Sequence, residues 1–524
     1  MSATLADLLS LGLASSPNAV ALRASDKSWT FTELDGFANA IALRLRTQYR
    51  VSPGDRVVVL TEKSPAIVAT ALAAWRLGAI YAPVDSENPV DRLGYILDRL
   101  EPSVVVSSAR VLARPALARF RGASLAYENL PNVDSERVEP RVEPHDLAAI
   151  VHTSGSTGMP KGVMLSHASI VSYFHNHNNY LRFRFGDCTL NTAPFHFDLS
   201  LNDAVMPIYF GAAAMVVSDV LLQSRFFSLV QKNSITHVLA ASSMLRLVSR
   251  KIEDVDKIAG SHLRLLATGA EVCPPKLINE WLTRVPGLRI LYGYGPTECN
   301  SSSLTHEVTS PDLGRVQPYP IGKPFDGVSA HLLDARGHAI ADQVATGVLA
   351  LGGPQLMCGY WRDPEATAAA FVQLPDGPHY VTGDLCRRDE AGDYHFQGRS
   401  DTQVKIRGRR MDINEVRDAL HRIGIVQHAV VGLVGNEDDP RLAALLQLDE
   451  PTEAHIAEVR GELARWAPPY MTPTYLFAAS RLPATGSGKL NEAEALRHVR
   501  MNVEADPYRR DAVIHIAVSG AFNG

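Results

Sequence analysis

The chain has 524 residues, of which 46% are hydrophobic and 20% are charged, and its formal net charge at pH 7 is -5. This length exceeds what one ordinary hydrophobic core accommodates, so at least two domains are expected. The charge balance provides no basic surface for nucleic acid or for an anionic membrane, and the sequence therefore predicts neither as a partner.

The first 150 residues alternate short apolar runs with helical patterns. Residues 57–60 and 104–106 are typical of buried strands. Between them a helix is predicted, because Ser64 suits an N-cap, Pro65 suits the first helical position and Gly78 ends the apolar pattern.

The apolar stretches of the chain do not predict a leader or a membrane span. The N-terminal MSATLADLLSLGLA lacks a basic leader and is predicted to form an amphipathic helix. The most apolar window, residues 65–84, contains Arg76 and Gly78, which indicates a buried helix and strand. The cysteines are scattered without metal or disulfide spacing, which favours a reducing, cytoplasmic setting. They are Cys188, Cys273, Cys299, Cys358 and Cys386.

The alternation continues through the middle of the chain and predicts a parallel sheet covered on both faces. The expected strands are residues 147–151, 212–217, 237–240, 264–267 and 289–291. Ligands of such sheets bind at the carboxyl ends of the strands. Glycine-rich polar segments follow three of these strands: TSGSTGMPKG (153–162), TGAE (268–271) and YGYGPTE (292–298).

The segment 153–162 has the composition of a phosphate-binding loop. It holds three glycines, four hydroxyl side chains and Lys161. Glycine lets the backbone approach a ligand closely, and successive N–H groups and hydroxyls can then surround phosphate oxygens. It is not a Walker A loop, because its spacing differs and no Ser or Thr follows Lys161. The alternative, an ordinary flexible Ser/Gly loop, is disfavoured by this density after a buried strand.

The pattern changes near residue 400, where a compact α+β unit is predicted to begin. Asp412 is a plausible N-cap, and Ile413, Val416, Leu420 and Ile423 share one helical face. Strands are expected at residues 429–433 and 443–448. We predict a domain boundary at residues 399–401.

Five motifs in order resemble those of the adenylate-forming superfamily, as found in stand-alone adenylation enzymes of the nonribosomal-peptide-synthetase type. They are the segments 153–162 and 292–298, YVTGDL (380–385), GRSDTQVKIRG (398–408) and PATGSGK (483–489). The resemblance implies an α/β fold with a large N-terminal domain of αβ-layered sheets and a small mobile α+β lid. The expected domains are an adenylation core (1–399), a lid (400–505) and a tail of unknown role (506–524).

The resemblance also implies a reaction and the residues that perform it. ATP and Mg²⁺ would convert a carboxylate to its AMP ester, and a thiol would then accept the acyl group. Lys489 would stabilise charge at the α-phosphate, Thr297 would contact that phosphate, and Glu298 would hold Mg²⁺. Asp401 would be the hinge. Asp384 would accept hydrogen bonds from the ribose hydroxyls, Tyr294 would stack near the adenine, and Gly269 to Glu271 would complete the adenine pocket. The whole ATP site would comprise Thr153, Ser154, Gly155, Ser156, Thr157, Gly158, Lys161, Gly269, Ala270, Glu271, Tyr292, Gly293, Tyr294, Asp384 and Arg399.

The stretch APFHFDLSLND (193–203) resembles the branch that activates amino acids, in which the aspartate of FD-x-S holds the substrate ammonium. Asp198 matches that aspartate, and Asp401 in the hinge motif also resembles this branch. The alternative is that Asp198 caps a helix and has no substrate role. The predicted pocket comprises Asp198, Leu199, Asn202, Leu239, Leu266, Thr268, Gly293, Ser301, Ser302 and His196. A small or medium neutral amino acid fits this wall, and a β-amino acid also fits.

Three functions follow from these observations. The first is an amino acid–carrier-protein ligase that loads the phosphopantetheine of a carrier protein in trans, as in nonribosomal peptide or polyketide biosynthesis. The second is an acyl-CoA synthetase for an amine-free acid. The third is a catalytically silent relative that binds a carrier protein. The joint presence of Lys161, Glu298, Asp384 and Lys489 disfavours the third.

Overall fold

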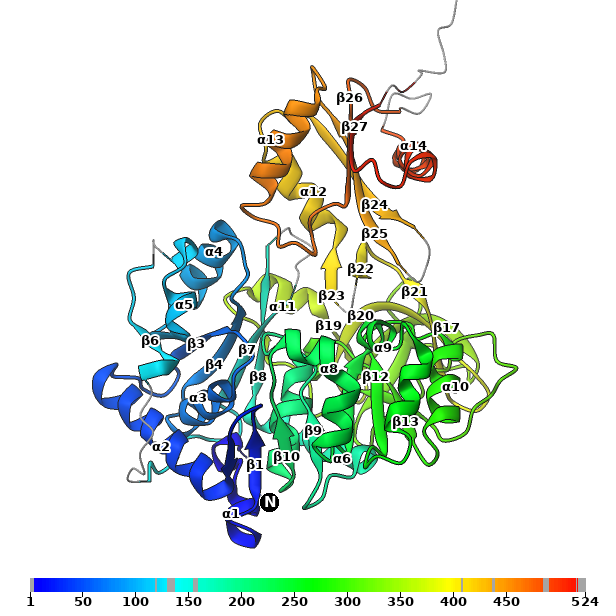
Figure 1. Cartoon of the computed structure of the whole chain (residues 1–524). Helices are drawn as coiled ribbons and strands as arrows, with labels where there is room; N and C mark the ends of the chain where they lie inside the picture. The colour runs from blue at the N-terminus through cyan, green and yellow to red at the C-terminus, as the bar shows by residue number, and fades with distance from the viewer. Residues whose placement is uncertain are drawn as a thin grey trace, which may run out of the picture.

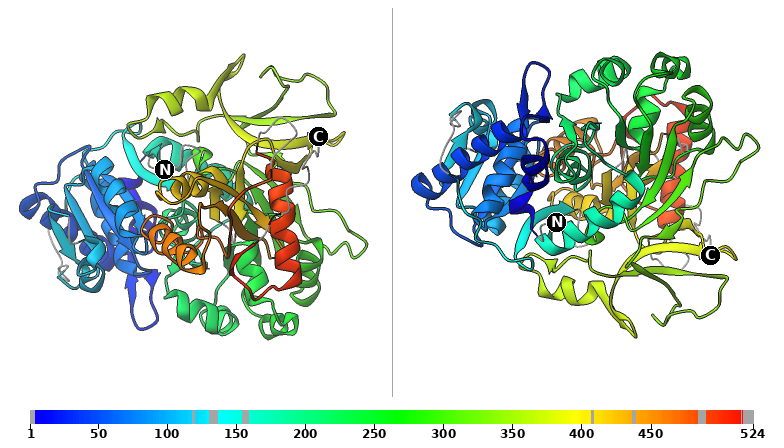
Figure 2. Two further views of the ribbon diagram at one scale, coloured as in Figure 1. Left: turned by 90° about the horizontal axis from the view of Figure 1, so that it is seen from above. Right: turned by 90° about the horizontal axis from the view of Figure 1, so that it is seen from below.

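The computed structural model of the chain describes residues 4–117, 120–129, 137–153, 159–406, 409–435, 439–483, 490–514 and 516. A broad body holds the N-terminal part, and a small domain coloured yellow to red stands above it (Figure 1). Seen from above, the small domain lies over the centre of the body, where the blue, green and yellow-green parts meet (Figure 2). This α/β architecture agrees with the predicted fold class. Among the described residues, no helix has the length and apolarity needed to cross a membrane.

A seven-stranded sheet forms the first layer of the body, in the order β18-β8-β7-β4-β3-β5-β6. Strands β3, β4, β5, β6 and β7 pair in parallel, whereas β8 and β18 pair antiparallel. The sheet is therefore mixed, although a parallel sheet was predicted. The bounds are β3 Arg56–Thr61, β4 Ile80–Asp85, β5 Val104–Ser107, β6 Ser124–Ala126, β7 Leu147–Thr153, β8 Lys161–Ser166 and β18 Gly359–Tyr360. The three strands predicted within this region are confirmed.

A nine-stranded sheet forms the second layer, in the order β15-β14-β13-β12-β11-β9-β10-β1-β2. Its centre is parallel and its outer strands β2, β14 and β15 are antiparallel. All four strands predicted here are confirmed. The bounds are β1 Val20–Arg23, β2 Ser28–Thr30, β9 Cys188–Leu190, β10 Ala213–Met215, β11 His237–Ala241, β12 Leu265–Gly269, β13 Arg289–Tyr294, β14 Leu304–Val308 and β15 Lys323–Pro324.

Six helices of the body, α2, α3, α5, α6, α8 and α11, begin after residues whose side chains cap them. Ser64 accepts a hydrogen bond from the Ala66 amide at 3.3 Å, and α3 (Pro65–Arg76) ends before Gly78, as predicted. The remaining helices are α2 Phe31–Gln48, α4 Val90–Leu100, α5 Ala109–Leu112, α6 His167–Leu181, α7 Met206–Tyr209, α8 Asp219–Lys232, α9 Ser242–Val248, α10 Pro275–Arg284 and α11 Pro364–Ala370.

The predicted N-terminal helix is instead divided. A 3-10 turn covers Leu5–Asp7, and α1 covers Ser10–Ser15. The backbone amide of Leu5 donates to Nδ1 of buried His167 at 3.1 Å. Tertiary contacts at this turn therefore prevail over the amphipathic pattern of the segment.

A third sheet is antiparallel, and its residues lie in the sequence between those of the two large sheets and those of the small domain. It orders its strands β16-β17-β20-β19, and β21 pairs with β20. The long strand β20 brings Asp384 opposite Arg399 of β21, so the candidate ribose carboxylate and its arginine are neighbours by strand register. The bounds are β16 Ser329–Leu333, β17 Ala345–Gly352, β19 Phe371–Leu374, β20 Gly377–Arg388 and β21 Tyr394–Arg399.

The small domain has its own hydrophobic clusters, formed by residues from Ile406 onward. Its hairpin consists of β22 (Gln403–Ile406) and β23 (Arg409–Asp412). Its main sheet has the order β24-β25-β26-β27. The other elements are α12 Ile413–His421, β24 His428–Val434, β25 Arg441–Gln447, α13 Glu453–Leu463, β26 Tyr475–Ala479, α14 Glu492–Ala505 and β27 Asp511–Val513.

Two expectations for the small domain need correction. Asp412 caps α12 as predicted, by accepting from the Asn414 amide at 2.9 Å, but Ile423 lies beyond the end of that helix. Residues 511–513, expected to belong to a separate tail, form β27 and pair in parallel with β26. Such pairing joins segments 35 residues apart in sequence (Leu476 with Asp511), which local patterns do not predict. The boundary at residues 399–401 remains a prediction.

Candidate active site

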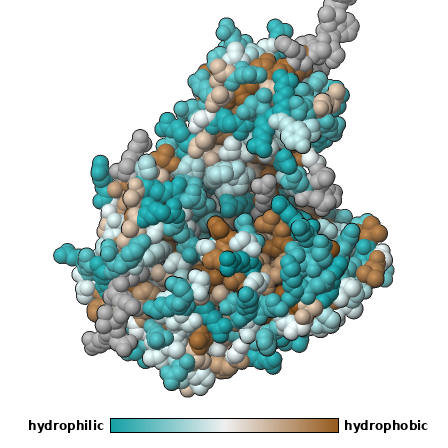
Figure 3. All heavy atoms as spheres, in the orientation of Figure 1, coloured by the Kyte–Doolittle hydropathy of each residue, from teal (hydrophilic) through white to brown (hydrophobic). Residues whose placement is uncertain are grey.

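A cavity of about 1710 Å³ lies where the two large sheets, the third sheet and the small-domain hairpin meet. The face toward the viewer in Figure 3 is hollowed below the small domain. Strands β7, β12 and β13 all contribute residues near their carboxyl ends, which is the position predicted for a ligand site. Three sheets and a second domain therefore contribute to one cavity.

The phosphate-loop motif begins at the rim of this cavity. Thr153, the last residue of β7, lines it. Lys161 opens β8 directly opposite Thr153 and lies over the ring of Tyr360, with its Nζ 5.1 Å from the ring centroid. The predicted ligands Ser154, Gly155, Ser156, Thr157 and Gly158 lie outside the described residues, as does Lys489.

Glu298 is held by a tyrosine and an arginine. It lies on the 3-10 turn Thr297–Cys299 and is 1% exposed. Its Oε1 accepts from the Tyr360 hydroxyl at 2.9 Å, and its Oε2 lies 3.0 Å from Nη1 of Arg410. Burial raises the pKa of Glu298, but the positive charge of Arg410 and the accepted hydrogen bonds outweigh burial, so the net pKa is lowered. Glu298 is thus an ionised carboxylate just behind the cavity wall, in contact with the lining residue Arg410.

The same carboxylate suits Mg²⁺. Mg²⁺ in nucleotide sites is bound by one or two carboxylates together with phosphate oxygens, so the donor set fits. A guanidinium already contacts Glu298 in this arrangement, and Arg410 belongs to the small domain. Glu298 could therefore hold Mg²⁺ once the hairpin withdraws.

Asp384 is bonded through both of its oxygens. Arg399 donates to Oδ1 and the Tyr294 hydroxyl donates to Oδ2. Arg399 is held in turn by Asp401, through hydrogen bonds of 2.6 Å from Nε and 2.8 Å from Nη2. The predicted hinge residue therefore orients the arginine beside the candidate ribose carboxylate. Tyr294, expected to stack near adenine, has its hydroxyl anchored to that carboxylate.

Asp198 has different surroundings. Burial raises the pKa of Asp198, and hydrogen bonds from Thr297 and from the Leu199 amide only partly offset this increase. The positive charge of Lys405 also lowers the pKa of Asp198 slightly. None of the ion pairs among the described residues includes Asp198. The next helical element is the π-helical turn Leu201–Val205, and its N-cap position is occupied by Ser200 and not by Asp198. Asp198 thus faces the cavity as a half-buried acid without a paired cation in the described part of the chain.

Most of the predicted acid pocket lines the same cavity. The lining includes Leu199, Leu239, Thr268, Gly293, Ser301, Ser302 and His196. Two predicted residues, Asn202 and Leu266, lie behind this wall and are buried. Asn202 donates through Nδ2 to Ser301 Oγ at 3.1 Å, so it can position a lining hydroxyl without reaching a ligand itself.

The predicted adenine segment is divided in a similar way. Gly269 and Ala270 line the cavity, whereas Glu271 and Tyr292 do not. Glu271 accepts from the Ser243 amide at 3.1 Å and from Arg246 at 3.2 Å. A side chain at Gly269 would place its Cβ 2.2 Å from the carbonyl oxygen of Gly293, so this position needs glycine for close packing of β12 on β13.

The cations of the small-domain hairpin were missed by sequence reasoning. Lys405, Arg409 and Arg410 all line the cavity, and burial lowers the pKa of Lys405. The available signal was the basic run KIRGRR (405–410), which begins within the hinge motif and extends two residues beyond it. The positions of these three cations in the cavity depend on how the small domain sits over the body, and the sequence does not specify this arrangement.

A second missed group surrounds His196. Its Nδ1 lies 3.1 Å from Thr61 Oγ1, and its Nε2 lies 3.4 Å from Asp85 Oδ2. Burial lowers the pKa of His196, although the charge of Asp85 opposes this effect. His196 is thereby fixed in the cavity wall two residues before Asp198.

Comparison with known proteins identifies the family. The family model of the AMP-binding enzymes matches residues 12–361. A plipastatin synthase of Bacillus subtilis is 32% identical over 500 residues, which are 93% of this chain and 19% of that protein. Gramicidin S synthase 2 of Brevibacillus brevis is 31% identical over 482 residues, which are 91% of this chain and 11% of that protein. The chain thus spans less than a fifth of the length of these relatives.

Solved structures agree with this result. A nonribosomal peptide synthetase protein containing adenylation and PCP domains superposes with a TM-score of 0.82 at 25% identity, over 94% of this chain and 84% of that chain. The o-succinylbenzoate CoA synthetase of Bacillus subtilis shares the fold, with a TM-score of 0.81 at 21% identity. The superposition covers 93% of this chain and 98% of that chain. The chain belongs to the AMP-binding enzymes, the adenylate-forming superfamily. Within that superfamily its sequence is similar to parts of peptide synthases, and its structure is similar to that of an adenylation-domain protein.

Proposed function

We propose that the chain activates a small or medium neutral amino acid, with an α- or β-amine, as its aminoacyl-AMP. The acyl group then passes to the phosphopantetheine thiol of a carrier protein. The observation that carries this proposal is Asp198, a half-buried carboxylate that faces the cavity with a raised pKa. An unpaired buried carboxylate is costly, and a substrate ammonium would supply its missing partner.

The remainder of the acid pocket supports a neutral side chain. Leu199 and Leu239 provide apolar wall, and Thr268, Ser301 and Ser302 provide hydroxyls. These groups suit a small polar or apolar side chain and an amine at either the α or the β carbon. None of the predicted acid-pocket residues is a lysine or an arginine; those that line the cavity come from other parts of the body and from the small domain, including its hairpin.

The nucleotide would bind on the other side of the cavity. Asp384 would accept hydrogen bonds from the ribose hydroxyls, and Gly269 and Ala270 would border the adenine. The loop of residues 153–158 and Lys161 would surround the phosphates. Mg²⁺ bound by Glu298 would neutralise triphosphate charge. Lys489 would stabilise negative charge where the acid meets the α-phosphate.

The contact between Arg410 and Glu298 suits the second half-reaction. Arg410 occupies the carboxylate that Mg²⁺ would need, so the observed arrangement fits the stage after pyrophosphate and metal have left. Lys489 would then act only when the lid presents another face to the cavity. The hinge at Asp401 lies directly before the hairpin and could swing it in or out.

Exchange of labelled pyrophosphate into ATP tests the proposal. The wild-type chain should catalyse exchange with one or a few neutral amino acids and much less with their des-amino analogues. Exchange only with amine-free acids would replace the proposal with an acyl-CoA synthetase. Absence of exchange with every acid tested would indicate the catalytically silent relative.

A further inference from the structure

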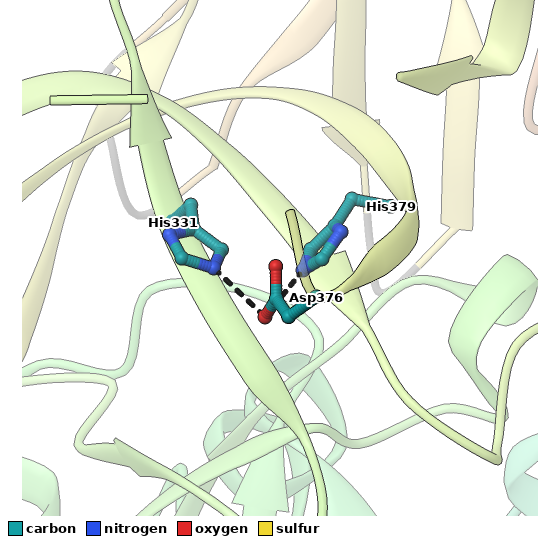
Figure 4. A group of neighbouring side chains, drawn as sticks. All are labelled: His331, Asp376 and His379. Carbon is teal, nitrogen blue, oxygen red and sulfur yellow. Dashed lines mark hydrogen bonds and ion pairs between the residues drawn. The ribbon is translucent and has the colours of Figure 1, made fainter. Parts of the chain in front are cut away.

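Three potential metal ligands converge on the third sheet, away from the cavity. They are His331 on β16, Asp376 in the turn between β19 and β20, and His379 on β20. Figure 4 shows both imidazoles directed toward the carboxylate of Asp376. Their ligand atoms all lie within 4.8 Å of one another. None of the three lines the active-site cavity.

Strand register places Ser329 in line with His379, and His331 lies two residues beyond Ser329 on the same face of β16. Ser329 of β16, Gly352 of β17 and His379 of β20 lie opposite one another across three strands. A Cβ on Gly352 would lie 2.5 Å from both His379 Nε2 and Ser329 Oγ. Glycine at this position therefore lets the side chains of β16 and β20 meet over the middle strand.

The hydrogen bonds of His379 make Nε2, and not Nδ1, the nitrogen that can bind a metal. Its Nδ1 lies 2.9 Å from the carbonyl oxygen of Gly377, which can only accept, so Nδ1 carries the proton. In the neutral ring Nε2 then presents a lone pair toward Asp376 and Ser329. A metal-bound histidine typically donates its other N–H to a carbonyl or carboxylate in this way. His379 is fully buried, so its ring orientation is fixed.

We propose that His331, Asp376 and His379 bind a divalent transition metal, with Zn²⁺ as the best match. The distances from Asp376 Oδ2 are 3.0 Å to His331 Nε2 and 3.5 Å to His379 Nε2. Ligands about 2.0–2.1 Å from a tetrahedral Zn²⁺ lie roughly 3.3 Å apart. Two imidazoles and one carboxylate favour Zn²⁺ over the oxygen-preferring Mg²⁺. Water or the hydroxyl of Ser329, 2.7 Å from His379 Nε2, would supply the fourth ligand.

The metal would join β16 to the start of β20. Asp384 lies further along β20, so the site would fix the strand that positions the candidate ribose carboxylate. The inference does not depend on the proposed function, because these residues contact neither the cavity nor the acid pocket.

Zinc binding to the full-length chain, stripped with EDTA and free of nucleotide, tests the inference. Isothermal titration with Zn²⁺ should show one more equivalent for wild type than for His331→Gln. The loss in affinity at this site should be about 100-fold or more, since losing an outer-shell partner alone costs about 10–100-fold. Mg²⁺ should not compete. His338→Gln is the matched control, because His338 is 77% exposed in its side chain and lies 3.8 Å from Asp334 in the same region.

Melting curves provide the second readout. Zn²⁺ should raise the melting temperature of wild type and of His338→Gln, but not of His331→Gln. Gly352→Ala should abolish the zinc effect by displacing the imidazole of His379, whose Nε2 would lie 2.5 Å from the added Cβ. Pyrophosphate exchange should be unchanged in His331→Gln. If wild type and His331→Gln bind the same number of zinc ions with the same affinities, the three residues form only a hydrogen-bonded group and the inference is wrong.

Discussion

On the nucleotide side of the cavity, Glu298 and Asp384 each contact an arginine. On the acid side, Asp198 contacts a threonine hydroxyl and a backbone amide. The first two carboxylates are thus compensated within the protein, and the pKa of Glu298 is lowered. The third is not compensated, and its pKa is raised. The difference supports the proposal that Asp198 is the carboxylate with which a substrate ammonium would pair, because a carboxylate without a paired cation gains most from a bound ammonium.

The largest expected effect concerns the positive charge at the reacting centre. Lys489→Ala should reduce pyrophosphate exchange about 10²–10³-fold, which corresponds to roughly 3–4 kcal/mol of transition-state stabilisation. Thioester formation from supplied aminoacyl-AMP should continue, since the lid then presents its hairpin. Single-turnover assays of the two half-reactions would measure both. Normal exchange by the variant would remove Lys489 from the proposed mechanism.

A smaller effect is expected from Arg410, which compensates Glu298 in the observed arrangement. Arg410→Met should slow thioester formation roughly tenfold or more, because a hydrogen bond between charged groups contributes about 1.5–3 kcal/mol. Exchange should remain near wild type, since Mg²⁺ would replace the guanidinium. Arg417→Met is the control, because Arg417 pairs with Glu492 inside the small domain. Equal loss of both half-reactions would instead show that Arg410 is needed for adenylation.

The comparison also predicts a pH dependence. Because burial raises the pKa of Asp198, lowering the pH should neutralise this acid before an ordinary aspartate. The kcat/KM for the amino acid should therefore fall at acidic pH more steeply than that for its des-amino analogue. In the ratio of the two pH profiles, the effects of groups that serve both substrates, including Glu298, cancel. A constant ratio would separate Asp198 from amine recognition.

The smallest effect is on stability. A carboxyl whose pKa is raised by folding favours the folded state when protonated, and this advantage is lost as pH rises through the raised pKa. Ionised Asp198 therefore opposes folding at neutral pH. Asp198→Asn should leave the melting temperature at pH 7 unchanged or raise it, and the difference from wild type should shrink at acidic pH. A clear decrease would support the helix-cap interpretation, in which loss of the cap costs about 1 kcal/mol.

Local sequence patterns predicted the parts of the structure that depend on local physics. Ser64 before Pro65 located the start of α3, and Asp412 located the start of α12. The alternating apolar runs located the central strands of both large sheets. Motif resemblance led to Asp198 and Asp384, which line the cavity, and to Glu298, which contacts the lining residue Arg410.

Features that depend on distant pairing escaped prediction. Arg410 and Glu298 are 112 residues apart, and their contact exists only because of the lid position. Strand β27 pairs with β26 although nothing in its short sequence specifies that partner. Asn202 has the polarity of a pocket residue but points to Ser301, because its place in a π-helical turn decides its direction.

The most direct test of the central claim compares wild type with Asp198→Ala on the amino acid and on its des-amino analogue. Removing one partner of a buried charge pair costs about 2–5 kcal/mol. The kcat/KM for exchange with the amino acid should therefore fall roughly 30-fold to several thousand-fold, and that for the analogue should change far less. Equal losses for both substrates, or no loss for either, would contradict the claim that Asp198 binds the substrate amine.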